Sequence, residues 1–186
     1  PAYYWIGRSN MALEKYEIAK NNFSKAIKLN PDDFASYSFI GVIENNEGNY
    51  SAAIKNFSKA IELNPKDFWS YYGTASAHYY LGNLEESIEY YSKAIELNPQ
   101  DADSFYYRGW SKWALKNYQA AISDTSKAIE LNPNKSNFIA RRAFYYLLED
   151  ESKNALNDIN KADSKDHVKE FIYELRGGYN YKIGNF

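Results

Sequence analysis

The stretch Lys-Ala-Ile-Glu-Leu-Asn-Pro at residues 59–65 decides the fold of this chain, because it returns at a fixed interval. It recurs unchanged at residues 93–99 and 127–133, and residues 25–31 differ from it only in having Lys28 in place of glutamate. The four prolines lie 34 residues apart. A fixed period of this length indicates a repeat architecture, in which each unit buries its apolar surface against its neighbours.

Taking each of these prolines as position 32 sets the boundaries of the units. We predict a single array over residues 1–186, with repeats at 1–33, 34–67, 68–101, 102–135 and 136–169, and a partial sixth repeat or capping helix at 170–186. The fifth repeat diverges near its end, where Asp163, Lys165 and His167 stand at positions held by Ile, Leu and Pro in earlier units. We therefore expect its second helix to end irregularly or to carry a more polar tail, and a new helix to begin at about Glu170.

Within each unit, a large residue at position 4 is followed by small residues at positions 8, 20 and 27. In the second repeat these are Tyr37, Gly41, Ala53 and Ala60. Spacings of three, four and seven residues are helical, so each unit is expected to form two helices that meet closely at the small residues. Three aspartates are placed to cap the helices that follow the prolines: Asp33, Asp67 and Asp101.

This pattern resembles the tetratricopeptide repeat, which also has an aromatic residue at position 24. Phe23, Phe57 and Tyr91 match that position in the first three repeats, whereas Thr125 and Ile159 depart from it. The resemblance covers essentially the whole chain. It implies an all-α fold, a right-handed α-solenoid of antiparallel helix pairs whose first helices line a concave groove. It also implies a protein-binding scaffold and no enzymatic activity.

Composition excludes several classes of partner. Net charge is −2, with 22 basic and 24 acidic residues mixed along the chain, so no basic surface for nucleic acid is expected. The chain has no cysteine and therefore no thiolate metal site. No apolar run approaches the roughly 20 residues that a membrane-spanning helix needs. His78 and His167 lie far apart without further ligand spacing, so we expect no metal, no cofactor and no catalytic residue.

Aromatic residues make up 18% of the chain, and many occupy positions that face the groove in the resembling family. The second repeat has only small, mildly polar residues at these positions. The predicted groove residues lie in the third to fifth repeats: Trp69, Tyr72, Tyr79, Tyr80, Tyr106, Trp110, Trp113 and Phe144. Such rings offer a large contact area at low entropic cost. The alternative is that some of them pack between adjacent first helices.

These rings favour a protein or peptide partner, bound as an extended or helical segment with apolar or proline side chains, in a complex that the array assembles. A carbohydrate-binding module that uses the same rings is an alternative, and end-to-end self-association of the array is another. Relatives that hold chaperone tails use a clamp of Lys, Asn and Arg. The corresponding residues here are Tyr4, Arg8, Phe39, Trp69 and Gly73, so we expect no carboxylate clamp.

Charged residues appear in a second pattern, at positions 7 and 23. Position 7 becomes arginine in the last three units, at Arg108, Arg142 and Arg176, and position 23 becomes Asp124 and Asp158. A second helix packs against first helices on both sides. We therefore predict structural ion pairs, in which Asp124 binds Arg108 or Arg142 and Asp158 binds Arg142 or Arg176.

Overall fold

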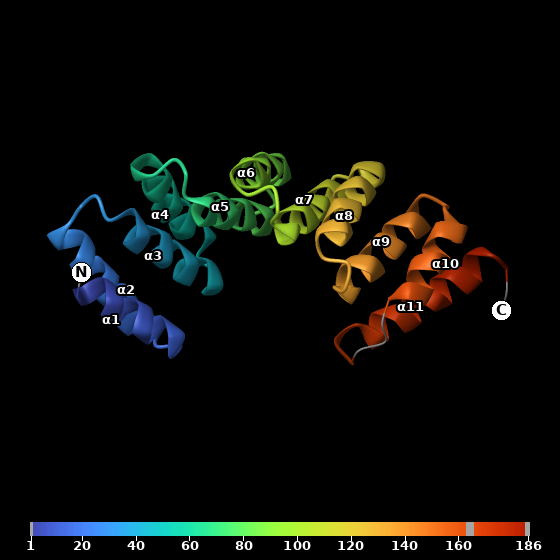
Figure 1. Cartoon of the computed structure of the whole chain (residues 1–186), viewed down its shortest axis with the longest axis horizontal. Helices are drawn as coiled ribbons and strands as arrows, with labels where there is room; N and C mark the ends of the chain where they lie inside the picture. Colours follow the sequence, from blue (N-terminus) through green and yellow to red (C-terminus); the bar gives the residue numbers. More distant parts are fainter. Residues whose placement is uncertain (1, 163–165, 185–186) are drawn as a thin grey trace. The chain divides into compact units, whose positions relative to one another are not determined.

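The structure is a computed structural model that describes residues 2–162 and 166–184. These residues form eleven α-helices and no strand, as the sequence predicts for an all-α solenoid of repeated helix pairs (Figure 1). The chain divides into two compact units, residues 1–97 and residues 98–186, and each is described by itself. The predicted boundaries of the individual repeats remain a prediction.

The first unit consists of three helix pairs. Its helices are α1 (Ala2–Ala12), α2 (Tyr16–Leu29), α3 (Phe34–Asn46), α4 (Tyr50–Leu63), α5 (Phe68–Tyr80) and α6 (Leu84–Leu97). Each odd-numbered helix packs against the helix that follows it, and α3 also packs against α5. The helices α1, α3 and α5 therefore form one layer, and this layer carries the candidate site.

The second unit continues the same pairing. Its helices are α7 (Ala102–Ala114), α8 (Tyr118–Leu131), α9 (Ser136–Leu148), α10 (Ser152–Lys161) and α11 (Asp166–Lys182). The helix α11 packs against both α9 and α10, and Val168, Ile172 and Leu175 bury its apolar side there. It closes an apolar core that includes Ile139 and Ile159.

The end of the fifth predicted repeat differs in detail from the sequence-based expectation. The helix α10 has 10 residues, whereas α8 has 14, so the second helix of the fifth repeat is shorter than that of the fourth. The following helix begins at Asp166 rather than near Glu170. Asp163 and Lys165, which carry the divergence, lie outside the described residues, as does the side chain of His167.

The predicted aspartate caps are confirmed. Asp33, Asp67 and Asp101 accept hydrogen bonds from the backbone N–H groups of Ser36, Ser70 and Ser104. These bonds satisfy donors that the first turn of a helix leaves without intrahelical partners. The caps fix the points at which α3, α5 and α7 begin.

Close approach of the helices depends on glycine at two positions that face Phe57. The ring of Phe57 on α4 is fully buried between α3 and α5. A Cβ atom added to Gly41 would lie 2.7 Å from this ring, and one added to Gly73 would lie 2.3 Å from it. Both distances are far shorter than a van der Waals contact, so the two glycines allow the ring to fill the space between three helices.

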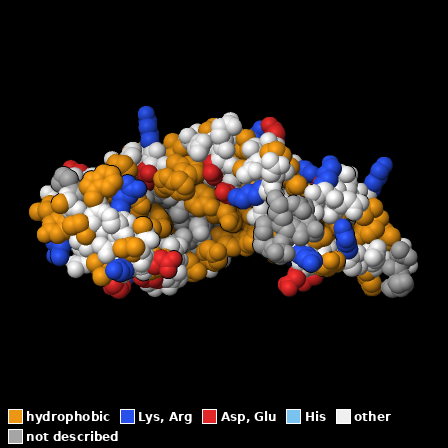
Figure 2. Space-filling model, turned by 60° about the horizontal axis from the view of Figure 1, so that its bottom comes forward, with side chains coloured by type: hydrophobic (Ala, Val, Ile, Leu, Met, Phe, Trp, Pro, Cys, Tyr) orange, Lys and Arg blue, Asp and Glu red, His pale blue; other side chains and the backbone are white. Residues whose placement is uncertain are grey.

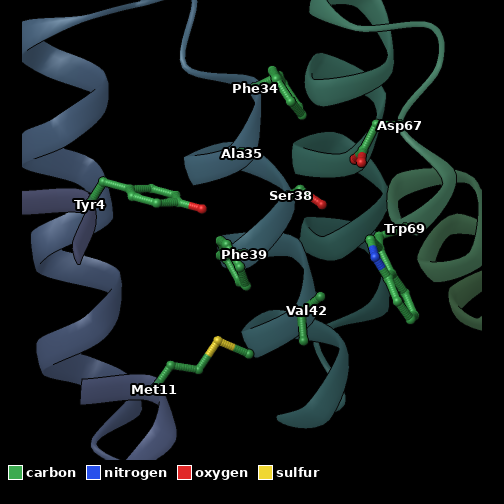
Figure 3. Close-up of a pocket in the computed structure, with 9 residues that line it drawn as sticks. All are labelled: Tyr4, Met11, Phe34, Ala35, Ser38, Phe39, Val42, Asp67 and Trp69. Atoms are coloured by element: carbon green, nitrogen blue, oxygen red, sulfur yellow. The ribbon is translucent and has the colours of Figure 1, made fainter. Parts of the chain in front are cut away.

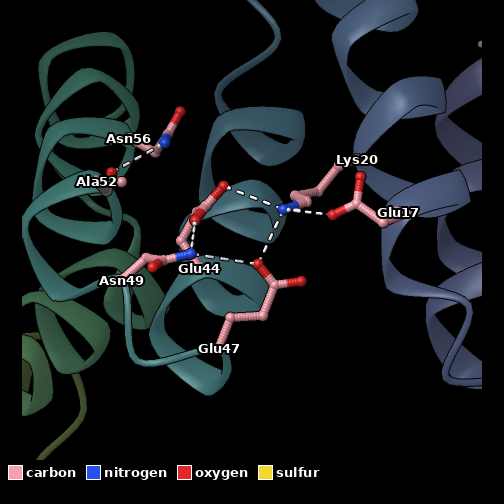
Figure 4. Close-up of polar contacts among 7 residues, drawn as sticks. All are labelled: Glu17, Lys20, Glu44, Glu47, Asn49, Ala52 and Asn56. Atoms are coloured by element: carbon pink, nitrogen blue, oxygen red, sulfur yellow. Dashed lines mark hydrogen bonds and ion pairs between the residues drawn. The ribbon is translucent and has the colours of Figure 1, made fainter.

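A polar network joins α2 to α3 on the first unit (Figure 4). Lys20 Nζ lies 2.8 Å from a carboxylate oxygen of Glu47, 2.9 Å from one of Glu17 and 3.4 Å from one of Glu44. Asn49 donates a further hydrogen bond to Glu44. The pKa of Lys20 is raised, chiefly by its hydrogen bonds with Glu47 and Glu17, so it remains a cation that links the first two helix pairs.

Candidate functional site

The predicted groove residues are divided between the two units. Trp69, Tyr72, Tyr79 and Tyr80 lie on α5 in the first unit. The other four lie on α7 and α9 in the second unit: Tyr106, Trp110, Trp113 and Phe144. The eight rings therefore form two sets, one in each unit.

On α5, the rings differ in how much surface they offer. Trp69 is 63% exposed and Tyr80 is 61% exposed, whereas Tyr72 and Tyr79 are half-buried. The rings of Trp69 and Tyr72 meet edge to face, with centroids 6.1 Å apart. Tyr80 stacks on Tyr50 of α4 at 5.1 Å. The two ends of α5 thus carry exposed aromatic surface.

On α7, Tyr106 is not a groove residue. It is 4% exposed, and its ring centroid lies 4.4 Å from that of Phe138 on α9, so it belongs to the core between adjacent first helices. Trp110, Trp113 and Phe144 are half-buried. Trp113 and Phe144 meet edge to face at 6.0 Å. The alternative of packing between first helices therefore holds for Tyr106.

A cavity of about 410 Å³ opens between the first helices of the first unit. Figure 3 shows Tyr4 and Met11 of α1 on one side and Trp69 of α5 on the other, with α3 between them. Its lining is mostly apolar and also includes Phe34, Ala35, Ser38, Phe39, Val42 and Asp67. Hydrophobic side chains reach the surface over this unit, at the left of Figure 2.

The sequence analysis missed most of this cavity. Tyr4 and Phe39 were considered only as members of an absent carboxylate clamp, and Met11 was not considered. The sequence does contain a signal for Tyr4, because Tyr4 occupies the same position of the first repeat as Tyr72 does in the third. Ala35 and Ser38, which the sequence analysis describes only as small and mildly polar, leave the space that the larger residues surround.

One charged residue lines the cavity, Asp67, and another, Arg8, contacts two of its rings. The guanidinium of Arg8 lies 5.9 Å from the ring centroid of Tyr4 and 5.7 Å from that of Phe39, both of which line the cavity. The carboxylate of Asp67 accepts hydrogen bonds from the N–H and the hydroxyl of Ser70. Asp67 is thus committed to capping α5, and the main chemical character of the cavity is apolar and aromatic.

Two of the predicted ion pairs form, and both lie in the second unit. Arg108 binds both carboxylate oxygens of Asp124 at 2.7 and 2.8 Å, and Arg142 binds both of Asp158 at 2.7 and 2.9 Å. In each case the arginine and the aspartate come from the two helices of one pair. Lys112, which the sequence analysis missed, also contacts Asp124 at 2.7 Å. Asp124 thus has two cationic partners.

Arg176 is not brought into such a pair. It is exposed on α11, and in the part of the chain that the structure describes Asp158 pairs with Arg142 instead. Asparagine takes the place of these aspartates in the first two repeats, where Asn22 and Asn56 donate to backbone carbonyls of their own helices. The residue at position 23 therefore bonds within its own helix in the first two repeats. In the fourth and fifth repeats it joins the two helices of a pair.

Among residues 2–162 and 166–184, no group of three or more histidine, cysteine, aspartate or glutamate side chains is arranged to hold a metal ion. Within the same residues, no helix has both the length and the apolar character required to cross a membrane. His78 stacks on Tyr90 with ring centroids 5.4 Å apart, which is a packing contact.

Several solved structures share this fold. MamA is 22% identical, with a TM-score of 0.81 over 89% of this chain and 96% of MamA. MamA residues 41 to the end from Desulfovibrio magneticus RS-1 are 19% identical, with a TM-score of 0.81 over 95% and 94% of the two chains. YrrB, described as a TPR protein with an unusual peptide-binding site, is 18% identical, with a TM-score of 0.79 over 94% and 90%. At these identities the likeness establishes the fold.

Sequence comparison identifies the repeats directly. Models of the tetratricopeptide repeat match residues 1–33, 68–101 and 102–135, and a model of the TPR repeat matches residues 41–82. No curated protein sequence matches the chain significantly. Proteins of this fold are typically non-catalytic interaction scaffolds. The repeat matches, the helix pairs and the related structures agree, and the chain belongs to the tetratricopeptide repeat family.

Proposed function

We propose that this protein binds a peptide segment of a partner protein on the first helices of its repeats and so assembles a complex. The observation that carries this proposal is the cavity of about 410 Å³ on α1, α3 and α5. Its volume falls within the range of roughly 300–1,000 Å³ that is usual for ligand sites. The related protein YrrB is described as having a peptide-binding site, which supports a ligand of this class.

The lining indicates the kind of side chain that the cavity accepts. Tyr4, Met11 and Trp69 surround it with apolar and aromatic surface, and Ala35 and Val42 leave room for an inserted group. A large apolar side chain of the partner would bury its surface there at about 25 cal/mol per Å². We therefore expect an apolar residue of the peptide to serve as the anchor.

The rings further along α5 extend this surface. Tyr72 lies beside Trp69, and the exposed Tyr80 lies at the other end of the same helix. A peptide anchored in the cavity could contact these rings with the residues that flank its anchor. For a single peptide we expect a micromolar dissociation constant, or about −8 kcal/mol.

The test uses short random peptides selected on the intact chain. The strongest peptide is then measured by calorimetry against wild type and against a Trp69→Ala variant. Because Trp69 is largely exposed, its removal should leave the fold intact, and we expect at least about a tenfold loss of affinity. Val42→Phe, which fills the cavity, should weaken binding in the same way.

A matched control is Tyr173→Ala, which removes a ring of similar exposure, 59%, from α11 in the second unit. It should change the affinity by less than about twofold. Equal affinities for wild type, Trp69→Ala and Val42→Phe would contradict the proposed cavity. Competition by soluble oligosaccharides would instead favour the carbohydrate-binding alternative.

A further inference from the structure

Arg141 on α9 is a half-buried cation with no acidic partner among the described residues. The other two half-buried arginines of the second unit are both paired. Arg142 binds Asp158, and Arg108 binds Asp124. A structural arginine in this unit therefore comes with a carboxylate, and Arg141 departs from that rule.

Aromatic rings take the place of a counter-ion around Arg141. Its guanidinium carbon lies 4.6 Å from the ring centroid of Trp110 on α7, 4.9 Å from that of Phe171 on α11 and 5.8 Å from that of Phe144. Cations are attracted to the faces of such rings, and arginine stacks on them. The rings of three successive first helices thus hold the guanidinium in place.

Part of the hydrogen-bonding capacity of Arg141 is left unused among the described residues, because its Nε atom is buried there without an acceptor. The side chain as a whole is half-buried, so part of it remains exposed. A guanidinium can donate two parallel hydrogen bonds to one carboxylate. Such bonds are stronger than those between neutral groups, because both partners are charged.

We propose that Arg141 binds an aspartate or glutamate side chain of a partner peptide, whose neighbouring apolar residues contact Trp110 and Phe171. This inference rests on the proposed peptide-binding function and adds a second anchor of opposite chemistry. The first unit takes an apolar side chain in its cavity, and the second unit takes an acidic one on α9.

The test begins with a library of short random peptides displayed with blocked C-termini, so that every available carboxylate is a side chain. Peptides selected on the intact chain should be enriched in Asp or Glu. The strongest acidic peptide is then synthesised with a C-terminal amide, in its original form and with the acidic residue replaced by its amide. Both are measured against wild type and Arg141→Met, which keeps an apolar chain of similar length beneath the rings.

On wild type, replacing the acid by its amide should weaken binding about tenfold. On Arg141→Met the two peptides should differ by less than about twofold, because the partner of the carboxylate is gone. Arg8→Met is the matched control. Arg8 also lies on aromatic rings, at 5.1–5.9 Å, but it is exposed and belongs to the first unit. This variant should retain the tenfold difference.

Several outcomes would overturn the proposal. An equal effect of the acid-to-amide change on wild type and Arg141→Met would do so, as would loss of the effect in Arg8→Met alone. If the amide-substituted peptide regained full affinity when resynthesised with a free C-terminal carboxylate, a terminal carboxylate would be the ligand instead. Peptides that bind without an acidic preference and depend on Trp69 would refute the role of Arg141 and leave the proposed function standing. Recovery of no peptide at all would count against both.

Discussion

Arg142 and Asp158 join α9 to α10 through two hydrogen bonds, from Arg142 Nε to Asp158 Oδ2 at 2.7 Å and from Nη2 to Oδ1 at 2.9 Å. Asp158 is only 1% exposed. Both oxygens of a buried carboxylate therefore depend on one guanidinium. Burial tends to lower the pKa of Arg142, but its hydrogen bonds and its attraction to Asp158 outweigh this and leave that pKa raised.

Removing this guanidinium should destabilise the second unit strongly. We expect Arg142→Met to lower the free energy of unfolding by about 3–5 kcal/mol, because it leaves a buried carboxylate without a partner. Urea unfolding measures the change. Asp103→Asn is the control, since it breaks the solvent-exposed pair with Lys135 and should cost less than about 1 kcal/mol. Equal losses in the free energy of unfolding for the two variants would show that the buried pair contributes no more to stability than the exposed one.

The network around Lys20 should contribute to stability more modestly. Lys20→Met removes the cation that links α2 to Glu44 and Glu47, so we expect a loss of about 1 kcal/mol in the free energy of unfolding. The contact with Glu17 lies in solvent and adds little. Lys59→Met is the control, because Lys59 binds only the exposed Glu62 on its own helix, and it should have no resolvable effect. A larger loss for Lys59→Met would contradict this.

The sequence predicted much of this fold, because its information is periodic. The spacing of the prolines predicted the repeated helix pairs, and single residues such as Asp33 and Asp67 predicted where helices begin. These features depend on residues that are close together in the sequence, so they can be recognised from the sequence alone. The end of α10 and the start of α11 were less predictable, because no repeated residue marks them there.

The candidate site could be predicted only in part. A position within a repeat predicts which face of a helix a residue occupies, but the depth of burial depends on the side chain opposite. Tyr106 and Tyr72 occupy the same position of their repeats, yet Phe138 covers Tyr106 and leaves it in the core. The cavity likewise arises from small residues, Ala35 and Ser38, placed between larger ones. Burial and cavity formation of this kind depend on how side chains of neighbouring helices pack, which the sequence of one repeat does not show.

The glycines that surround Phe57 lead to a further prediction. Gly73→Ala would place a Cβ atom 2.3 Å from the fully buried ring of Phe57, so we expect a loss of about 1–3 kcal/mol in the free energy of unfolding. Gly177→Ala on α11 is the control, since the added group would have no atom within 4 Å other than its chain neighbours and the nearby backbone of its own helix. It should be neutral or stabilise by up to about 1 kcal/mol. Partial recovery in Gly73→Ala combined with Phe57→Leu would support steric crowding as the cause.

The last prediction concerns the dependence of stability on pH. Burial lowers the pKa of His78, while Glu86 acts weakly in the opposite direction. The side-chain amide nitrogen of Asn83 lies 3.3 Å from Nδ1 of His78, a contact that suits a neutral ring whose Nδ1 accepts. Since the pKa in the folded state lies below the unfolded value of about 6.5, the unfolded chain binds the proton more readily. The stability gained from neutral His78 is therefore present above that pH and lost as the pH falls towards the folded pKa.

His78→Phe keeps the ring that stacks on Tyr90 and removes the titrating group. Urea unfolding of both proteins at about pH 7.5 and about pH 5 isolates the effect, because the other titrating residues are common to the two. We expect wild type to lose more stability than His78→Phe on acidification. An equal or smaller loss in wild type would mean that His78 takes up its proton as readily in the folded chain as in the unfolded one. The stacking on Tyr90 would then tolerate the charged ring.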